Sequence, residues 1–484
     1  MVSRRGLLGG ATIVGMGALI DLAGPGAVAQ AETLDTPFTP VLVPHLAQAE
    51  LMVQYQRMLA AGAVPAGLAG HWPLDGNGAD LSGLNRPVTA GPDATWSTAR
   101  AGGALALGGT AGAYASGPSV VDTTAPFTVA AWVQLGDTTA IRTAVSQDGA
   151  TTSRFLLHFD PTGGGWSFKV RSADQAQKVA AVAGTPVTAN TWTHLTGVWD
   201  GANVRLYVNG ALAGSAADTT TPWDSPQGLN IGRAKWDGAP ANRWIGSVDD
   251  VRLWGRALTA AEIAVVGGLT ARQNNQYSFA TANVVWGQPS DPATWFSQAR
   301  CASFLTKVLK YTYPWAADGS YHQQWFGASS PEAADYQAGF AGNPGPHFRP
   351  VLRPADLRPG DLIAVNYNGS DTRNTGHIVM VRSVKGVYTG SAVYPTETQY
   401  AVEIIDCTSD AHGVFGVGNY GTYPDTRMVG AVDADNLQGV GIGHMMFYAA
   451  NDTGYFSRYR WSVNTASDKT YTVTQRPIAA ARVV

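Results

Sequence analysis

The sequence predicts a multidomain protein in which an all-β sandwich is followed by an α+β domain. Between residues 66 and 268, short alternating apolar runs are separated by turn signals about every ten residues, which is typical of an antiparallel sandwich. From residue 271 to 484 the pattern changes to one long helix followed by strands. With 484 residues and 45% hydrophobic content, the chain is long enough to bury more than one full core.

The first 31 residues have the features of an export signal. Ser3-Arg4-Arg5 precedes an apolar stretch that is too short to span a membrane, and Ala29-Gln30-Ala31 matches a small-x-small cleavage site. The paired arginines resemble a bacterial twin-arginine signal, and an ordinary secretory signal with two chance arginines is the alternative. Both interpretations predict an exported protein, extracellular or in the cell envelope. Residues 32–65 are predicted to form a linker with an amphipathic helix from Ala47 to Ala61.

Charge and cysteine content exclude several classes of function. A net charge of −3 without a basic run gives no electrostatic footprint for nucleic acid. After the signal, no segment is apolar for long enough to predict an integral membrane protein. Two cysteines exclude a disulfide scaffold and a multi-cysteine metal cluster.

Turn chemistry and alternation predict individual elements of the sandwich. Residues 127–135 are apolar on both faces, as expected of a central strand between two packed sheets. Asn209-Gly210 separates two apolar runs and favours the positive φ angles of a type I′ hairpin. Thr259 stands three residues before Glu262, which predicts a capping box at the start of a short helix.

Several motifs of this region resemble the laminin-G-like jelly roll of the concanavalin-like superfamily. In chain order they are His71–Gly78, Phe127–Leu135, Trp192–His194, Val198–Gly201, Tyr207–Gly210 and Ile245–Trp254. The resemblance implies a carbohydrate- or protein-binding module, and many members hold calcium at an acidic edge. The candidate Ca²⁺ ligands here are Asp75, Asn77, Asp80 and Asp249, because hard Ca²⁺ prefers oxygen. The same residue types form tight turns without a metal, and this interpretation is slightly favoured.

The second region contains a cysteine, a histidine and an aspartate in an order that suggests chemistry. A helix is predicted from Asp291 to Tyr313, and Cys301 lies beside its apolar stripe. Downstream, a Pro-Gly-Asp turn leads into one strand, His377 opens the next strand, and Asp406 closes a third. A single cysteine on a helix is most often a small buried hydrophobe, so the order of the three residues carries the inference.

That order resembles the papain-like cysteine peptidases, closest to the NlpC-type and CHAP branches that cut cell-wall peptides. The resemblance implies that Cys301 is the nucleophile and His377 the base. It further assigns Asp406 to orient the imidazole and Gln298 to the oxyanion hole, while His412, in a predicted loop, competes with Asp406 for the third role. The chemistry agrees, because a catalytic thiolate needs an imidazolium and a helix N-terminus beside it, and the imidazole needs a third group to fix its tautomer.

Two structural expectations follow from this assignment. The apolar stripe continues upstream of Cys301 to Trp295, so a break in the helix is expected near Ser297-Gln298, with Ser297 as the new cap. If Asp406 faces the site, strand alternation directs Cys407 to the opposite face, which argues against a disulfide with Cys301.

The sequence therefore predicts an exported cysteine hydrolase that acts on amide bonds of cell-wall peptides and needs no cofactor for catalysis. The jelly roll would bind glycan or protein. Acyl transfer to an amine stays open, because the sequence does not separate it from hydrolysis. The alternative is a secreted, non-enzymatic glycan-binding or adhesion protein with a degenerate second domain, and an inert Cys301 thiol would favour it.

Overall fold

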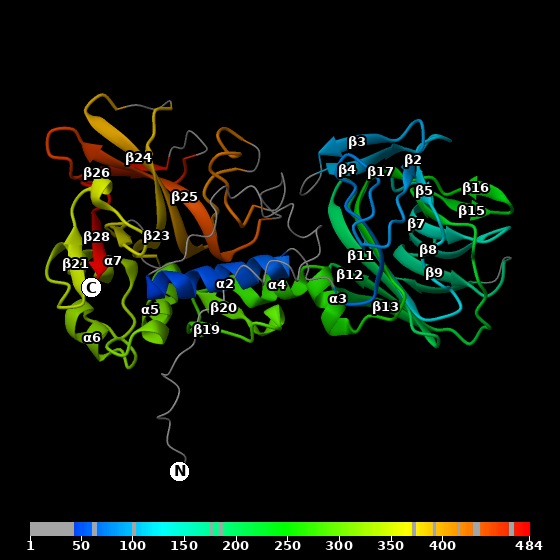
Figure 1. The fold of residues 1–484 in the computed structure, drawn as a ribbon, viewed down its shortest axis with the longest axis horizontal. Helices are drawn as coiled ribbons and strands as arrows, with labels where there is room; N and C mark the ends of the chain where they lie inside the picture. The colour runs from blue at the N-terminus through cyan, green and yellow to red at the C-terminus, as the bar shows by residue number, and fades with distance from the viewer. Residues whose placement is uncertain are drawn as a thin grey trace, which may run out of the picture.

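The computed structural model describes residues 43–60, 65–98, 103–174, 178–182, 187–369, 374–390, 394–414, 417–428, 436–463 and 469–484. The predicted export signal and the first part of the predicted linker lie outside these residues. The chain forms two lobes, which are joined along one side by helices (Figure 1). Within the described ranges, no helix has the length and apolar character needed to cross a membrane.

The first lobe is a sandwich of two antiparallel sheets. Its strands are β1 (Leu68–Trp72), β2 (Thr89–Ala90), β3 (Thr95–Thr98), β4 (Gly103–Gly108), β5 (Ala115–Gly117), β6 (Phe127–Leu135), β7 (Arg142–Asp148), β8 (Ser153–Asp160), β9 (Gly165–Arg171), β10 (Lys178–Val182), β11 (Trp192–Trp199), β12 (Asn203–Val208), β13 (Ala211–Ala217), β14 (Leu229–Ile231), β15 (Ala234–Trp236), β16 (Ala239–Ala241) and β17 (Ile245–Trp254). One sheet has the order β13-β12-β11-β6-β17-β4-β3, with β1 paired to β17, and the other has the order β10-β9-β8-β7-β14-β5-β2. Their facing sides enclose one apolar core, which confirms the predicted jelly-roll sandwich.

Local sequence signals of this lobe are confirmed where they depend on turn or cap chemistry. Asn209 and Gly210 have φ angles of 48° and 81° and join β12 to β13. Helix α3 (Ala260–Val266) begins after Thr259, whose hydroxyl accepts a hydrogen bond from the Glu262 N–H. The Glu262 carboxylate accepts from the Thr259 N–H at 2.8 Å, which completes the capping box.

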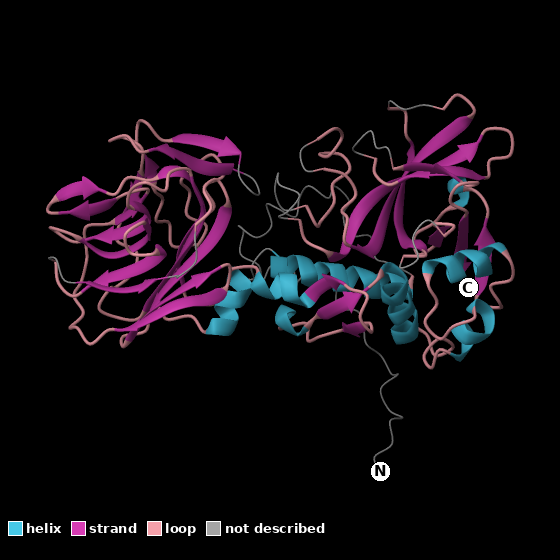
Figure 2. Cartoon of the chain, turned by 180° about the vertical axis from the view of Figure 1, so that it is seen from behind, coloured by secondary structure: helices cyan, strands magenta, loops and turns pink. Residues whose placement is uncertain are grey.

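The second lobe packs helices against one face of an antiparallel sheet (Figure 2). Its elements are α4 (Leu269–Asn274), β18 (Asn275–Tyr277), β19 (Asn283–Val285), η3 (Pro292–Thr294), β20 (Phe296–Ala299), α5 (Cys301–Thr312), α6 (Ser320–Phe326), α7 (Ala333–Ala341), β21 (Phe348–Val351), η4 (Pro354–Asp356), β22 (Leu362–Asn366), β23 (Gly376–Val387), β24 (Glu397–Thr408), β25 (Gly439–Ala450), β26 (Phe456–Arg460), β27 (Thr470–Thr472) and β28 (Ile478–Val483). The large sheet has the order β21-β28-β22-β23-β24-β25-β26-β27, and a small sheet has the order β18-β20-β19.

An N-terminal helix belongs to the core of this second lobe. Helix α2 (Pro44–Ala60) confirms the predicted helix, and it buries Leu46 and Met52 in one cluster with apolar residues of α5 and the large sheet. His45 fixes its start, because its ring nitrogens lie 2.7 Å from the Tyr313 hydroxyl and 2.8 Å from the Gly360 carbonyl oxygen. The segment is therefore more than a linker. The jelly roll is inserted between α2 and the rest of the lobe to which α2 belongs.

The single helix predicted from Asp291 to Tyr313 is wrong in its first half. Residues 292–294 form a 3-10 turn, and β20 pairs with β18 on one side and β19 on the other. These strand pairings are non-local, so they override the local helical pattern. The expected break exists, but Arg300 caps α5 in place of Ser297, and the helix begins at Cys301.

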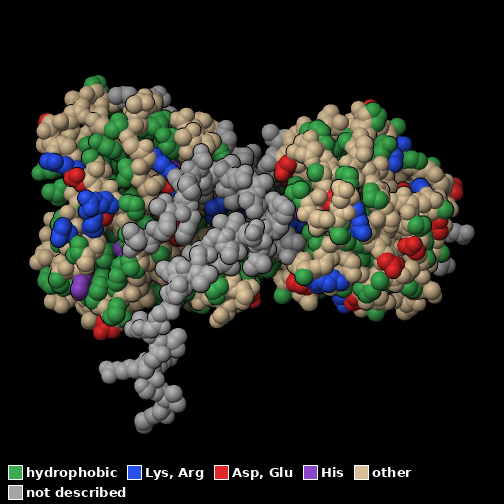
Figure 3. Space-filling view, viewed as in Figure 1, with side chains coloured by type: hydrophobic (Ala, Val, Ile, Leu, Met, Phe, Trp, Pro, Cys, Tyr) green, Lys and Arg blue, Asp and Glu red, His purple; other side chains and the backbone are tan. Residues whose placement is uncertain are grey.

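Charged side chains of both signs are scattered over the face of the molecule seen in Figure 3. Acidic and basic groups are interspersed on both lobes, and the described part of this face has no continuous basic surface. This distribution agrees with the net charge of −3.

Candidate functional site

Cys301 is the first residue of α5. The chain enters in the extended conformation of β20, and Arg300 keeps extended angles (φ −94°, ψ 171°) before the helix starts. The side chain is buried, with 3% of its surface exposed, and its Sγ lies 3.9 Å from the carbonyl oxygen of Gly376. At this position the unpaired N–H groups and the positive end of the helix dipole stabilise a thiolate.

His377 lies beside Cys301 because it is the second residue of β23 and follows Gly376 directly. Its Nε2 lies 2.7 Å from Oδ2 of Asp406. An ionised carboxylate only accepts hydrogen bonds, so Nε2 carries a proton and Nδ1 is the ring nitrogen left for Cys301. Burial lowers the pKa of His377, but charge and hydrogen-bond interactions with Cys301 and Asp406 outweigh burial and raise this pKa to about 9. This raised pKa favours the imidazolium form of the ring at neutral pH.

Asp406 is the centre of a buried network. It lies on β24, next to β23 in the sheet, and is fully buried. Oδ2 accepts from His377 and, at 3.1 Å, from Nε2 of His412, while Oδ1 accepts from Nη1 of Arg427 at 2.7 Å. Burial raises the pKa of Asp406, but Arg427, His412 and these hydrogen bonds hold that pKa well below its usual range. These contacts therefore favour the carboxylate form of the group that orients His377.

His412 lies in a loop, as the sequence predicts, but this part of the loop is buried rather than at the surface. The His412 side chain is completely buried, with Nδ1 2.6 Å from the Trp461 carbonyl oxygen and Nε2 on Asp406. Both ring nitrogens therefore face acceptor oxygens, one from the Trp461 backbone and one from the Asp406 carboxylate. His412 is therefore not a competitor of Asp406 for His377 but a second donor to the same carboxylate.

Sequence reasoning missed Asp425 and Arg427. The Arg427 guanidinium donates to both oxygens of Asp425, at 2.9 Å from Nε and 2.7 Å from Nη2, in addition to its bond with Asp406. Asp425 also accepts from the backbone N–H of His412 at 2.9 Å. These contacts explain why the segment carrying His412 is buried. The only sequence signal is an Asp-x-Arg triplet in a loop, which has no specific meaning on its own.

The buried contacts of the cluster converge on Asp406. Its carboxylate pairs with His377, His412 and Arg427, and Arg427 pairs with Asp425 as well. Removing one partner of such a buried pair leaves the other without its compensating contact, so the members of the cluster depend on one another.

The second cysteine is separate from this chemistry. Cys407 is buried and free, as is Cys301, which confirms that the two do not form a disulfide. Its Sγ lies 3.2 Å from the carbonyl oxygen of Ala299, and burial raises its thiol pKa well above the ordinary value. Cys407 is therefore an internal reference for an unreactive thiol.

Gln298 lies on β20, and its side-chain amide lies 3.4 Å from the hydroxyl of Ser278. Its role in an oxyanion hole stays a prediction. The backbone N–H groups at the start of α5 are placed at Cys301 by the helix itself, so they can supply donors to an oxyanion without it.

Three of the four candidate calcium ligands already accept hydrogen bonds from backbone N–H groups. Asp80 accepts from the backbone N–H groups of His71, Ser82 and Arg86. Asp75 accepts from the Gly103 N–H and Asn77 from the Ala79 N–H, while Asp249 lies on β17. Over the described ranges, the group whose potential ligand atoms lie within 4.8 Å of one another is His377, Asp406 and His412. The geometry thus agrees with the turn interpretation, and calcium binding stays a prediction.

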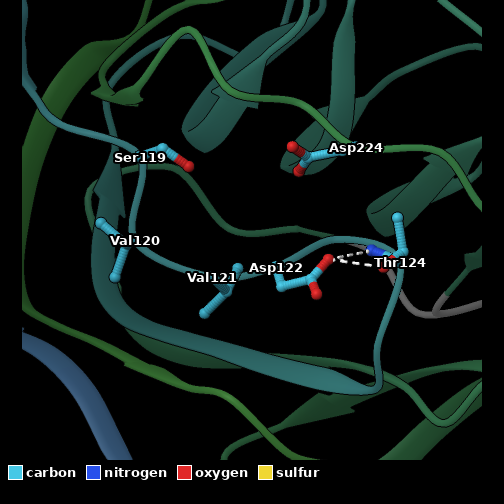
Figure 4. Close-up of a pocket in the computed structure, with 6 residues that line it drawn as sticks. All are labelled: Ser119, Val120, Val121, Asp122, Thr124 and Asp224. Atoms are coloured by element: carbon cyan, nitrogen blue, oxygen red, sulfur yellow. Dashed lines mark hydrogen bonds between the residues drawn. The ribbon is translucent and has the colours of Figure 1, made fainter.

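A separate cavity of about 430 Å³ lies in the jelly roll, near the turn after β5 (Figure 4). Its walls are mostly polar, with Ser119, Asp122, Thr124 and Asp224 around Val120 and Val121. Asp122 accepts hydrogen bonds from the N–H and hydroxyl of Thr124 at 2.8 Å and 2.6 Å, which orients its carboxylate.

Comparison with known proteins finds a family model that matches most of the jelly roll. Residues 107–264 match the family model described as the Concanavalin A-like lectin/glucanases superfamily. This match confirms the predicted jelly-roll resemblance, and it ends before the helix that carries Cys301. Among curated proteins, none matches the chain in sequence.

Several solved structures resemble parts of the chain with TM-scores below 0.4. Domain 4 of AbnA, a GH43 extracellular arabinanase from Geobacillus stearothermophilus in complex with arabinotriose, is 19% identical, with 41% of this chain and 98% of that chain covered and a TM-score of 0.34. The CBM40 of Ruminococcus gnavus IT-sialidase bound to α2,3-sialyllactose is 17% identical over 30% of this chain and 84% of that chain, with a TM-score of 0.27. The binding domain of Paraclostridial Mosquitocidal Protein 1 is 11% identical over 86% and 92% of the two chains, with a TM-score of 0.36. At these scores, no conclusion about this chain rests on them.

Proposed function

We propose that the protein is a papain-like cysteine hydrolase that cleaves amide bonds, with cell-wall peptides as its substrates. The observation that carries the proposal is the placement of Cys301 at the N-terminus of α5, against the carbonyl of Gly376, with the neighbouring His377 ring bonded to Asp406. A structural cysteine requires neither the charged imidazole nor the buried carboxylate behind it, whereas an activated thiolate requires both.

The proposed reaction proceeds through a thioester. The thiolate of Cys301 attacks the substrate carbonyl carbon, and N–H groups at the start of α5 donate to the oxygen that becomes negative. The C–N bond then breaks, and His377 gives its proton to the leaving amine. Water next attacks the thioester while His377 takes a proton from it, which releases the carboxylic acid and restores the thiolate–imidazolium pair. Asp406 keeps the imidazole in the orientation needed for both proton transfers.

The jelly roll is proposed to be a glycan-binding module that holds the hydrolase on its polymeric substrate in the cell envelope. Its family match supports this proposal, and the polar cavity beside Asp122 offers carboxylates and hydroxyls that suit sugar hydroxyl groups. Binding of the full chain to cell-wall polysaccharide, compared with an Asp122→Ala/Asp224→Ala variant, tests the cavity. Equal binding by both proteins would exclude the cavity as the glycan site.

The hydrolase proposal is tested by product analysis. Purified cell-wall peptides incubated with the full chain should yield fragments with new amine and carboxyl ends, detected by mass spectrometry, and Cys301→Ala should yield none. Cys407→Ala is the matched control and should retain cleavage. A product joined to an added amine would show acyl transfer, and cleavage by Cys301→Ala would refute the proposed nucleophile.

A further inference from the structure

The segment that precedes β28 runs beside the proposed active site. The backbone N–H of Asn366 donates to the carbonyl oxygen of Pro477 at 2.9 Å. Asn366 is also the register partner of Gly376, whose carbonyl oxygen contacts Cys301 Sγ. Pro477 is therefore connected to the nucleophile through Asn366 and Gly376, and Arg476 is the residue immediately before Pro477.

Arg476 is held in place by three tyrosines. Its guanidinium carbon lies 4.0 Å from the ring centroid of Tyr367 and 3.6 Å from that of Tyr471, and Nη1 donates to the Tyr459 hydroxyl at 2.9 Å. Tyr367 is itself anchored at the site, because its N–H donates to the Thr375 carbonyl oxygen at 2.9 Å. Stacking between two aromatic rings fixes the plane of the guanidinium before any ligand arrives.

This guanidinium lacks an anionic partner among the residues that the structure describes. Its contacts there are the two rings and the Tyr459 hydroxyl. Arg458, on the adjoining strand β26, differs in this respect: it stacks on Tyr394 at 3.7 Å but also pairs with Glu397 at 2.9 Å. Arg476 is partly exposed, so it presents an oriented and uncompensated cation to solvent near Cys301.

We propose that Arg476 is a specificity-determining residue that binds a carboxylate of the substrate close to the scissile amide. The inference deepens the proposed function and rests on it for the substrate class, since it selects acidic peptides among amide substrates. A planar guanidinium with free N–H groups donates two parallel hydrogen bonds to a carboxylate, which an amide or an apolar group does not accept equally well. Charge-assisted hydrogen bonds of this kind commonly change affinity about ten- to hundredfold.

The test compares two forms of one cell-wall peptide, one with a free glutamate carboxylate and one with this carboxylate converted to an amide. The full chain should cleave the carboxylate form with a kcat/KM at least about tenfold higher, mainly through a lower KM. In Arg476→Gln this ratio should fall toward one, and Arg476→Lys should retain part of it. Arg458→Gln, which removes a stacked but ion-paired arginine, should leave the ratio at the wild-type value.

Equal cleavage of both peptides by the wild type would overturn the inference, as would an Arg476→Gln variant that loses activity on both forms in equal proportion. A binding experiment separates this failure from failure of the proposed function. Calorimetric titration of Cys301→Ala with the same two peptides should show the preference for the carboxylate form, and Cys301→Ala/Arg476→Gln should lose it. If neither peptide is cleaved, the hydrolase assignment is wrong, while the binding pair still decides for or against Arg476.

Discussion

Substitution of Asp406 by asparagine tests the buried network that orients His377. Both oxygens of Asp406 accept hydrogen bonds, from His377 at 2.7 Å and His412 at 3.1 Å on Oδ2, and from Arg427 at 2.7 Å on Oδ1. An asparagine side chain retains one acceptor oxygen and presents N–H donors where the second oxygen stood. Either Arg427 or the two histidines must then face a donor without water to replace the lost bond.

The magnitude follows from these contacts. A hydrogen bond to a charged group contributes about 1.5–3 kcal/mol, and removing one partner of a buried ion pair costs about 3–5 kcal/mol. We therefore expect Asp406→Asn to lower the free energy of unfolding by about 3–5 kcal/mol, measured by urea denaturation of the full chain. Turnover should fall as well, because the imidazole loses its carboxylate.

Asp410→Asn is the matched control for this experiment. Asp410 follows Asp406 by four residues, its side chain is 56% exposed and it pairs with Lys469 at the surface. Its replacement should change stability by less than about 0.5 kcal/mol. If Asp406→Asn also remained within about 1 kcal/mol of the wild type, the charged network would not stabilise the fold, and the reasoning would fail.

Three further predictions concern the same lobe. His412→Ala should reduce turnover and should lower the free energy of unfolding by about 2–4 kcal/mol, because it leaves the buried Trp461 carbonyl unsatisfied and removes one donor to Asp406. A variant with unchanged turnover and stability would show that the cluster does not depend on His412. In a kcat/KM profile measured between pH 6 and 11, activity should fall with a midpoint near pH 9, because His377 must keep its proton for the leaving amine and its pKa is raised to about 9. A fall in activity near pH 7 would contradict this assignment. A chain without residues 43–60 should lose the cooperative unfolding transition of the second lobe, because α2 fills part of the core of this lobe. Calorimetry would measure this transition, and an unchanged transition would show that the helix is only peripheral.

The features that the sequence predicts correctly depend on local chemistry. Turn residues and alternation located the Asn209-Gly210 hairpin and the sandwich strands, and the spacing of strand starts and ends placed His377 and Asp406 on neighbouring strands. The hydrogen bond between their side chains required only that both strands belong to one sheet.

The parts that sequence missed depend on contacts between distant segments. Local periodicity extended the helix through residues 296–299, where pairing with β18 and β19 makes a strand. The sequence predicts His412 in a loop, but it does not show that Asp425 and Arg427 hold this loop against Asp406. Likewise, the sequence of α2 does not show that the residues it packs against follow the jelly roll in the chain.

The pH dependence of Cys301 alkylation tests the central claim most directly. If Cys301 is a thiolate paired with imidazolium, iodoacetamide should modify it at a pH well below that at which a free thiol, with a pKa of about 8.5, reacts. Cys407, fully buried and with a raised thiol pKa, should remain unmodified in the same molecule. His377→Ala should move Cys301 labelling to the pH range of a free thiol. Slow labelling of both cysteines at the same rate, or labelling of Cys301 unaffected by His377→Ala, would contradict the assignment of a Cys-His catalytic pair.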